Sequence, residues 1–208
     1  EQDEATALRI NGDAPGALAP LLERLDALKA DGLQRIRLMY LYPSEVKAPL
    51  TDVMLGLDTV VPYFDLSLQH VSKELLRRMR RWGDGDRFLR RIADIRRRAP
   101  EAAFRSNFIV GYPGETERDH DQLLAFVEEA QLDWCGFFAY SPEEGTYAVG
   151  LDGEVAEGLM NERLAELREL QDRITATRRD ALVGTVQRVL VDRPGVARST
   201  REAPEIDG

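Results

Sequence analysis

The stretch Arg105-Ser-Asn-Phe-Ile-Val-Gly-Tyr-Pro-Gly-Glu115 decides the fold, because it predicts a buried strand that ends in a glycine-rich turn and then enters a helix. Aromatic and β-branched side chains supply the strand's bulk. Thr116 is the expected helix N-cap, with Asp119 in capping-box position. The carboxyl end of such a strand is where parallel α/β proteins bind small ligands. A plain strand-to-helix turn, with glycines for steric reasons alone, is the alternative for this stretch taken by itself.

The segments around this stretch alternate between strand and helix patterns. Such alternation predicts a parallel sheet with right-handed crossovers. Four strands are too few to close a barrel, so an open or partial barrel fits better. The expected strands are 35–42, 60–69, 104–110 and 132–140, and the expected helices are 17–30, 46–57, 72–81, 86–99, 115–130 and 154–182.

The strand 60–69 places Asp65, Ser67 and Gln69 on one face, because side chains alternate along a strand. In a half-exposed sheet these polar groups would face water. In a barrel the same period puts them inside, near a cofactor. After the helix 154–182, the segment 186–192 alternates as a strand, and Pro194-Gly195 predicts a turn.

Composition narrows the class of protein. The chain has 208 residues and 43% hydrophobic residues, enough for a real core. No run approaches the roughly 18 apolar residues that a membrane span needs, so we expect a soluble protein with no membrane partner. The single cysteine excludes an internal disulfide, so we expect a cytoplasmic protein. The net charge of −9 disfavours non-specific nucleic-acid binding and mildly favours a basic partner. One cysteine, Cys135, and two histidines cannot hold a cysteine-ligated cluster, so no metal ligands are expected in this chain.

Several stretches together resemble the radical S-adenosylmethionine methylthiotransferases, and most of all the branch that modifies an aspartate of a small-subunit ribosomal protein. These stretches are 61–70 with Met79 and Arg81, 105–115, 140–145 and 203–208. The resemblance implies a partial (incomplete) radical SAM TIM-like α/β barrel with parallel strands, followed by the start of a small β-barrel TRAM domain. The implied divisions are 1–153 for the barrel, 154–183 for a connecting helix and 184–208 for the TRAM start.

The chain departs from this family in one respect. The family holds a 4Fe-4S cluster on a Cys-x-x-x-Cys-x-x-Cys loop and a second cluster in an amino-terminal domain, and neither occurs here. We therefore expect a fragment that is inactive alone, with the clusters and S-adenosylmethionine belonging to a full-length parent. In the family the reduced cluster and S-adenosylmethionine generate a radical, and a methylthio group is then added to an unactivated carbon.

The resemblance and the strand pattern together suggest cofactor-binding residues, although no catalytic residue is assigned. Backbone at the turn would contact the adenine, a hydroxyl or amide would bind the ribose, and an arginine would pair with the methionyl carboxylate. Asn107 is preferred to Ser106, since the two point to opposite faces. The predicted set is Gln69, Arg81, Ser106, Asn107, Ile109, Val110, Gly111 and Tyr112.

Two other functions stay open. One is a methylthiotransferase of transfer RNA, which is a close relative with the same chemistry. The other is a cluster-free nucleoside-binding module. The expected partners are a small-subunit ribosomal protein as substrate and RNA through the TRAM domain, and the protein is expected to be a monomer.

Overall fold

The structure is a computed structural model, and it describes residues 17–204. Expectations for residues 1–16, and for the last four residues of the 203–208 match, lie outside the described residues. The helices are α2 Leu18–Asp26, the 3-10 helix η1 Ala27–Asp31, α3 Ala48–Gly56, α4 Lys73–Arg78, α5 Gly85–Arg98, α6 Glu117–Ala130, the 3-10 helix η2 Tyr147–Gly150 and α7 Glu157–Asp180. The strands are β1 Tyr63–Gln69, β2 Ala103–Val110, β3 Trp134–Ala139, β4 Leu190–Arg193 and β5 Val196–Arg198.

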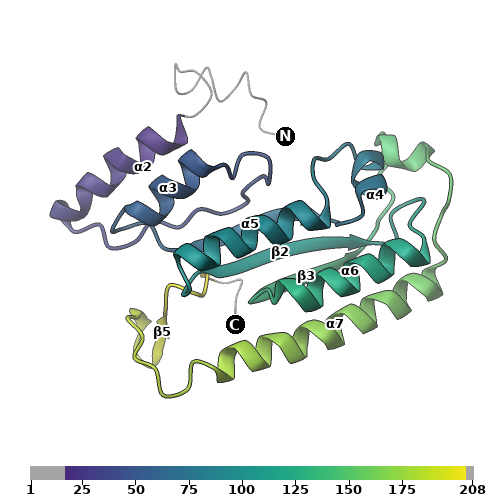
Figure 1. Cartoon of the computed structure of the whole chain (residues 1–208). Helices are drawn as coiled ribbons and strands as arrows, with labels where there is room; N and C mark the ends of the chain where they lie inside the picture. Colours follow the sequence, from purple (N-terminus) through teal and green to yellow (C-terminus); the bar gives the residue numbers. More distant parts are fainter. Residues whose placement is uncertain (1–16, 205–208) are drawn as a thin grey trace.

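The main sheet is parallel, with strand order β1-β2-β3, which confirms the expected α/β class. Asp65 lies opposite Arg105, and Asn107 lies opposite Gly136. The pairing of β1 with β2 shifts register between Leu66 and Gln69. Helices α5, α6 and α7 run alongside the strands (Figure 1).

The predicted strand 35–42 is not a continuous strand. It makes two isolated parallel bridges to the β1 segment, at Ile36 with Val60 and at Leu41 with Leu66. Between them Tyr40 has a left-handed φ of 57°, and its N–H donates to the Asp65 carboxylate at 2.9 Å. A left-handed residue interrupts the extended backbone that a ladder needs, so pairing is lost in the middle of the segment.

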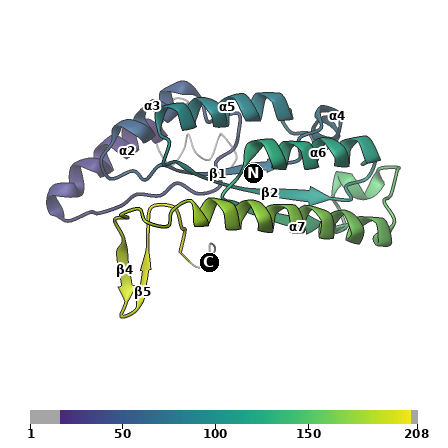
Figure 2. The same ribbon diagram turned by 60° about the horizontal axis from the view of Figure 1, so that its bottom comes forward.

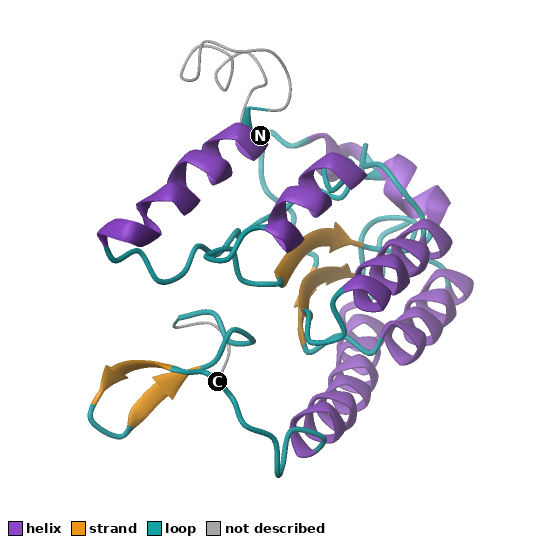
Figure 3. Cartoon of the chain, turned by 60° about the vertical axis from the view of Figure 1, so that its left-hand side comes forward, coloured by secondary structure: helices purple, strands orange, loops and turns teal. Residues whose placement is uncertain are grey.

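One face of the sheet packs against the helices and forms the core. Phe64 and Phe104 stack with ring centres 5.4 Å apart, and Phe108 stacks on Phe137 at 5.8 Å. Each fully buried side chain of this size contributes about 1.5–3 kcal/mol. The other face carries Asp65, Ser67, Arg105, Asn107, Ile109, Gly136 and Phe138, and we call it the open face. Figure 3 shows the β4–β5 hairpin set apart from the strands of the main sheet.

The helix boundaries follow from local chemistry. The capping box of Thr116 and Asp119 begins α6 as predicted, with both reciprocal hydrogen bonds present. Ser72 caps α4 by accepting from Leu75 N–H. That helix ends at Arg78 and not at 81, because Arg80 adopts a left-handed φ of 56°.

The long helix α7 buries a narrow apolar stripe against the sheet, as its sequence period predicts. Leu164, Leu167, Leu170 and Ile174 are buried, while most neighbouring residues are charged and exposed. Spacings of three and four residues place these side chains on one face of the helix. The helix therefore covers β3 along its length, with its polar side toward solvent.

The carboxyl-terminal residues form the antiparallel hairpin β4–β5, which projects away from α7 (Figure 2). The segment that follows the hairpin returns to the amino-terminal ends of the main strands. Arg35 donates to the carbonyls of Arg198 and Ser199 at 3.0 Å, and Trp134 Nε1 donates to the Arg201 carbonyl at 3.0 Å. Within residues 17–204, no helix is both long and apolar enough to cross a membrane.

Candidate functional site

The open face holds a buried ion pair near its centre. Arg105 Nη1 donates to Asp65 Oδ1 at 3.0 Å, and these side chains are only 13% and 3% exposed. The second Asp65 oxygen accepts from Tyr40 N–H. Asp65 therefore has its charge and its hydrogen bonds satisfied by the protein. Strand alternation already placed Arg105 with Asn107, but the sequence reasoning gave this arginine no role.

Ser106 and Asn107 point to opposite faces, as the alternation of β2 predicts. Ser106 lies on the helix side, fully buried, and its Oγ donates to the Leu66 carbonyl at 2.7 Å. Asn107 lies on the open face, and its buried Oδ1 has no hydrogen-bond partner among the described residues. Such an acceptor is uncommon and fits a ligand donor such as a ribose hydroxyl.

Gly136 makes room for the Asn107 amide. A Cβ built on Gly136 would lie 2.8 Å from Asn107 Oδ1 and 2.8 Å from the Phe138 ring. Phe138 is itself 56% exposed, which is unusual for so large an apolar side chain in a strand. The open face therefore offers an unpaired amide oxygen close to an exposed aromatic ring.

The turn after β2 is fixed by contacts within the protein. Gly111 has φ +81°, and a Cβ there would lie 2.4 Å from Met160 Sδ on α7. Its N–H donates to Glu115 Oε2 at 2.6 Å. Close packing against Met160 of α7 by itself requires glycine at this position. The Gly111 N–H is likewise occupied, so the backbone contact predicted for adenine cannot use this donor.

Glu115 is the buried carboxylate that orders this turn. Arg163 Nη1 donates to Glu115 Oε1 at 3.0 Å, and these two side chains are 4% and 0% exposed. Burial raises the pKa of Glu115 above its ordinary value, despite the Gly111 hydrogen bond and the Arg163 charge. Glu115 therefore steadies the turn, with Arg163 from α7 as its partner.

The other predicted residues at the turn differ in which of their atoms reach the open face. Ile109 is half-buried on the open face, whereas Val110 is fully buried on the helix side and offers only backbone to that region. Tyr112 meets the Tyr140 ring edge-on at 5.3 Å. The Tyr140 hydroxyl is buried without a hydrogen-bond partner among the described residues.

Gln69 and Arg81 converge on Ser67. Gln69 Nε2 donates to Ser67 Oγ at 3.0 Å, and Arg81 Nη2 donates to the Ser67 carbonyl at 2.7 Å. The Arg81 guanidinium also lies 4.7 Å from the centre of the Tyr42 ring. Burial lowers the pKa of Arg81 from its ordinary value. These two predicted residues therefore form one cluster at the carboxyl end of β1, separate in register from Asn107.

His70, the residue after Gln69, helps to fix the start of α4. His70 is fully buried, and its Nδ1 accepts from Ser72 N–H at 3.0 Å at the start of α4. Burial lowers the pKa of His70 to about 4, so the ring is neutral at pH 7.

The chain's own residues do not fit an iron–sulfur cluster. Cys135 is its one cysteine, and burial raises the pKa of that thiol well above its ordinary value. A cluster needs several thiolates. Residues 17–204 contain no group of three or more histidine, cysteine, aspartate or glutamate side chains that could hold a metal ion.

Comparisons with known proteins agree with this architecture. The family model described as the Radical SAM superfamily matches residues 4–127. The ribosomal protein uS12 methylthiotransferase RimO of Cutibacterium acnes is 49% identical over 194 residues, which cover 92% of this chain and 40% of that protein. RimO of Moorella thermoacetica is 46% identical over 191 residues, covering 92% and 44%. The chain thus spans less than half the length of these curated relatives.

A solved structure also resembles this fold. Coproporphyrinogen III oxidase (HemN) from Escherichia coli, a radical SAM enzyme, matches with a TM-score of 0.62 at 18% identity. The match covers 77% of this chain and 38% of that one. At this identity the likeness concerns the arrangement of strands and helices, which agrees with the expected partial barrel.

Proposed function

We propose, because this chain belongs to the radical SAM superfamily, that the open face of its sheet binds S-adenosylmethionine in a methylthiotransferase that modifies an aspartate of a ribosomal protein. The names of the similar proteins support this substrate, since they are methylthiotransferases of ribosomal protein uS12. One structural observation supports the cofactor assignment, namely the buried Asn107 oxygen that has no hydrogen-bond partner among the described residues and lies on the open face.

The residues of this chain would bind and orient the cofactor. Asn107 would accept from a ribose hydroxyl, and the Arg81 guanidinium would face the methionyl carboxylate. Ile109 and Phe138 would supply apolar contact and keep water out. The cofactor supplies radical chemistry when it is bound beside a reduced cluster, whereas the protein orients the cofactor and excludes water from the site.

The cluster itself would require cysteines outside this chain, since Cys135 cannot hold one. This chain alone is therefore proposed to be inactive. The gene that encodes it should specify a cysteine trio upstream of Glu1. A parent gene without such a trio would refute the proposal.

The domain divisions also remain proposals. Residues 1–153 would belong to the barrel, 154–183 to a connecting helix and 184–208 to the beginning of a TRAM domain that contacts RNA. The β4–β5 hairpin supports the last part, because it is a separate antiparallel unit beyond α7. We also propose a cytoplasmic monomer.

The cofactor assignment is tested with two adjacent variants of the full-length gene product, reconstituted with its clusters without oxygen. Asn107→Ala should weaken S-adenosylmethionine binding roughly threefold to tenfold, the loss of one hydrogen bond. Ser106→Ala is the matched control, because its hydroxyl bonds the Leu66 carbonyl on the helix side. Calorimetry should show little change for this control. Equal affinities in both variants and the parent would refute the role of Asn107.

The substrate is tested separately by mass spectrometry. The reconstituted full-length product is incubated with purified ribosomal protein uS12 and, in parallel, with unmodified transfer RNA. A methylthio group on an aspartate of the protein supports the proposal. Modification of the transfer RNA alone would move the assignment to that branch of the family.

A further inference from the structure

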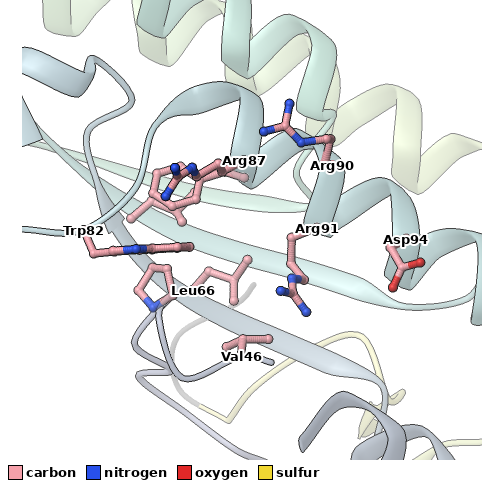
Figure 4. A pocket seen from close by; sticks show the side chains of 10 residues that line it. Val46, Leu66, Trp82, Arg87, Arg90, Arg91 and Asp94 are labelled. Carbon is pink, nitrogen blue, oxygen red and sulfur yellow. The ribbon is translucent and has the colours of Figure 1, made fainter. Parts of the chain in front are cut away.

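A cavity of about 490 Å³ lies on the other side of β1 from the open face, between this strand and α5 (Figure 4). Its floor is apolar and buried, with Val46, Leu66 and Leu68 at 1–3% exposure. Ser67, between the two leucines, belongs to the open face. The cavity is therefore a separate place from the proposed cofactor site.

Arginines on one side of α5 line this cavity. Arg87 and Arg91 are four residues apart, so they share a helix face, and Arg90 lies beside them. In Figure 4 the Arg91 side chain extends from α5 toward Val46, and the Trp82 ring lies beside Leu66. Trp82 is 43% exposed. The cavity thus combines an apolar floor, an aromatic wall and the guanidinium groups of Arg87 and Arg91.

The charge of these arginines is not balanced locally. Arg90 and Arg91 make no hydrogen bond or ion pair with any side chain in residues 17–204. Arg87 pairs with Asp84 at 3.2 Å, and its guanidinium lies 5.5 Å from the centre of the Trp82 ring. One carboxylate, Asp94, lines the cavity.

Asp94 is already engaged from the carboxyl-terminal side of the helix. Arg97 bonds its Oδ1, and Arg98 lies 3.9 Å from its Oδ2. Like charges four residues apart destabilise a helix slightly, so an anion between them would be stabilised. The excess is local, since the whole chain carries a net charge of −9.

We propose that this cavity binds a small organic anion, with a carboxylate, sulfonate or phosphate group on a flat apolar body. Its volume lies within the range of about 300–1,000 Å³ that small-molecule sites occupy. The Arg91 fork matches the oxygens of such an anion, and the Trp82 ring offers a stacking surface. The apolar body of the molecule would cover the apolar floor of the cavity. A bare inorganic ion would leave that floor exposed to water.

The test uses 8-anilinonaphthalene-1-sulfonate as the probe on the intact protein, followed by its fluorescence and by energy transfer from Trp82. Arg91→Met keeps the length of the side chain and removes its charge. The probe's affinity should fall roughly tenfold, the loss of one charge-assisted contact. Arg173→Met on α7 is the matched control, because Arg173 is 62% exposed and does not line the cavity. Circular dichroism checks that both variants are folded.

Two further probes separate the parts of the proposal. Uncharged N-phenyl-1-naphthylamine should bind at least roughly tenfold more weakly than the sulfonate, if the guanidinium groups recognise the anion. Millimolar inorganic phosphate should not displace the sulfonate, if the apolar floor contributes. The proposal is overturned by equal sulfonate binding in Arg91→Met and the parent, by equal binding of the uncharged probe, or by full displacement with phosphate. Trp82→Phe should remove most of the energy transfer, and unchanged transfer would place the probe elsewhere.

Discussion

Replacing Arg163 by methionine should destabilise the protein by about 3–5 kcal/mol at pH 7, because it leaves the Glu115 carboxylate buried without its charge partner. Glu115 is 0% exposed at its side chain, and Arg163 is 4% exposed. The methionine fills much of the volume, so the loss is mainly electrostatic. The second partner of Arg163 is Glu117, which is 71% exposed and adds at most about 1 kcal/mol.

The loss of stability in Arg163→Met should become smaller as the pH falls. Burial already raises the pKa of Glu115, and removing Arg163 raises it further. For a carboxyl whose folded pKa is above its unfolded value of 4.5, protonation favours the folded state at low pH. That favourable contribution is lost as the pH rises through the folded pKa. Arg163→Met should therefore be much closer to the parent at pH 5 than at pH 7.

Urea unfolding of four proteins measures this, namely the parent, Arg163→Met, Glu115→Gln and the double variant. Adding Glu115→Gln to Arg163→Met should recover most of the stability at pH 7, since a neutral amide replaces the stranded charge. Arg173→Met should cost about 0.5 kcal/mol or less, as an exposed pair on the same helix. A loss that is independent of pH and unchanged in the double variant would show that packing, not charge, determines it.

Three other perturbations follow from the described contacts. Gly111→Ala should lower the free energy of unfolding by about 1–3 kcal/mol through crowding against Met160, in addition to the strain of a left-handed φ at alanine. In urea unfolding, adding Met160→Ala to this variant should recover the part of the loss that is due to crowding. The His70 ring should titrate with a midpoint near 4 by NMR, whereas a midpoint of 6.5 would contradict its burial. Because the folded ring stays neutral while the unfolded ring takes up a proton, the stability of the protein should fall as the pH drops from 6.5 toward 4. Asp133→Asn should lower the free energy of unfolding by about 3 kcal/mol, because the Asp133 carboxylate accepts from both Arg178 and Arg201. The carboxyl-terminal segment should then be cleaved faster by protease, and a cleavage rate equal to the parent's would contradict this prediction.

Local rules predicted much of the fold. The strand period separated Ser106 from Asn107, and the capping box fixed the start of α6, because both depend on near neighbours in the sequence. The stripe on α7 was predicted from its helical spacing in the same way. The parallel sheet followed from the alternation of strands and helices.

The remaining features depend on contacts between distant residues, which local patterns cannot reveal. Met160 requires the glycine at 111, although the two lie far apart in the chain. Tyr40 interrupts a predicted strand because the Asp65 carboxylate accepts its N–H. The cavity beside α5 escaped prediction for a related reason, since charged helix faces are usually solvated and only packing against β1 gives this one a floor.

The segment that returns from the hairpin has a consequence for synthesis in the cell. Ala203 packs with Tyr63, and Arg201 donates to the Glu101 carbonyl, at the lower rim of the main sheet. A ribosome must therefore have translated nearly all of residues 17–204 before this rim is sealed. Until then Tyr63, which is fully buried in the folded structure, lacks its contact with Ala203.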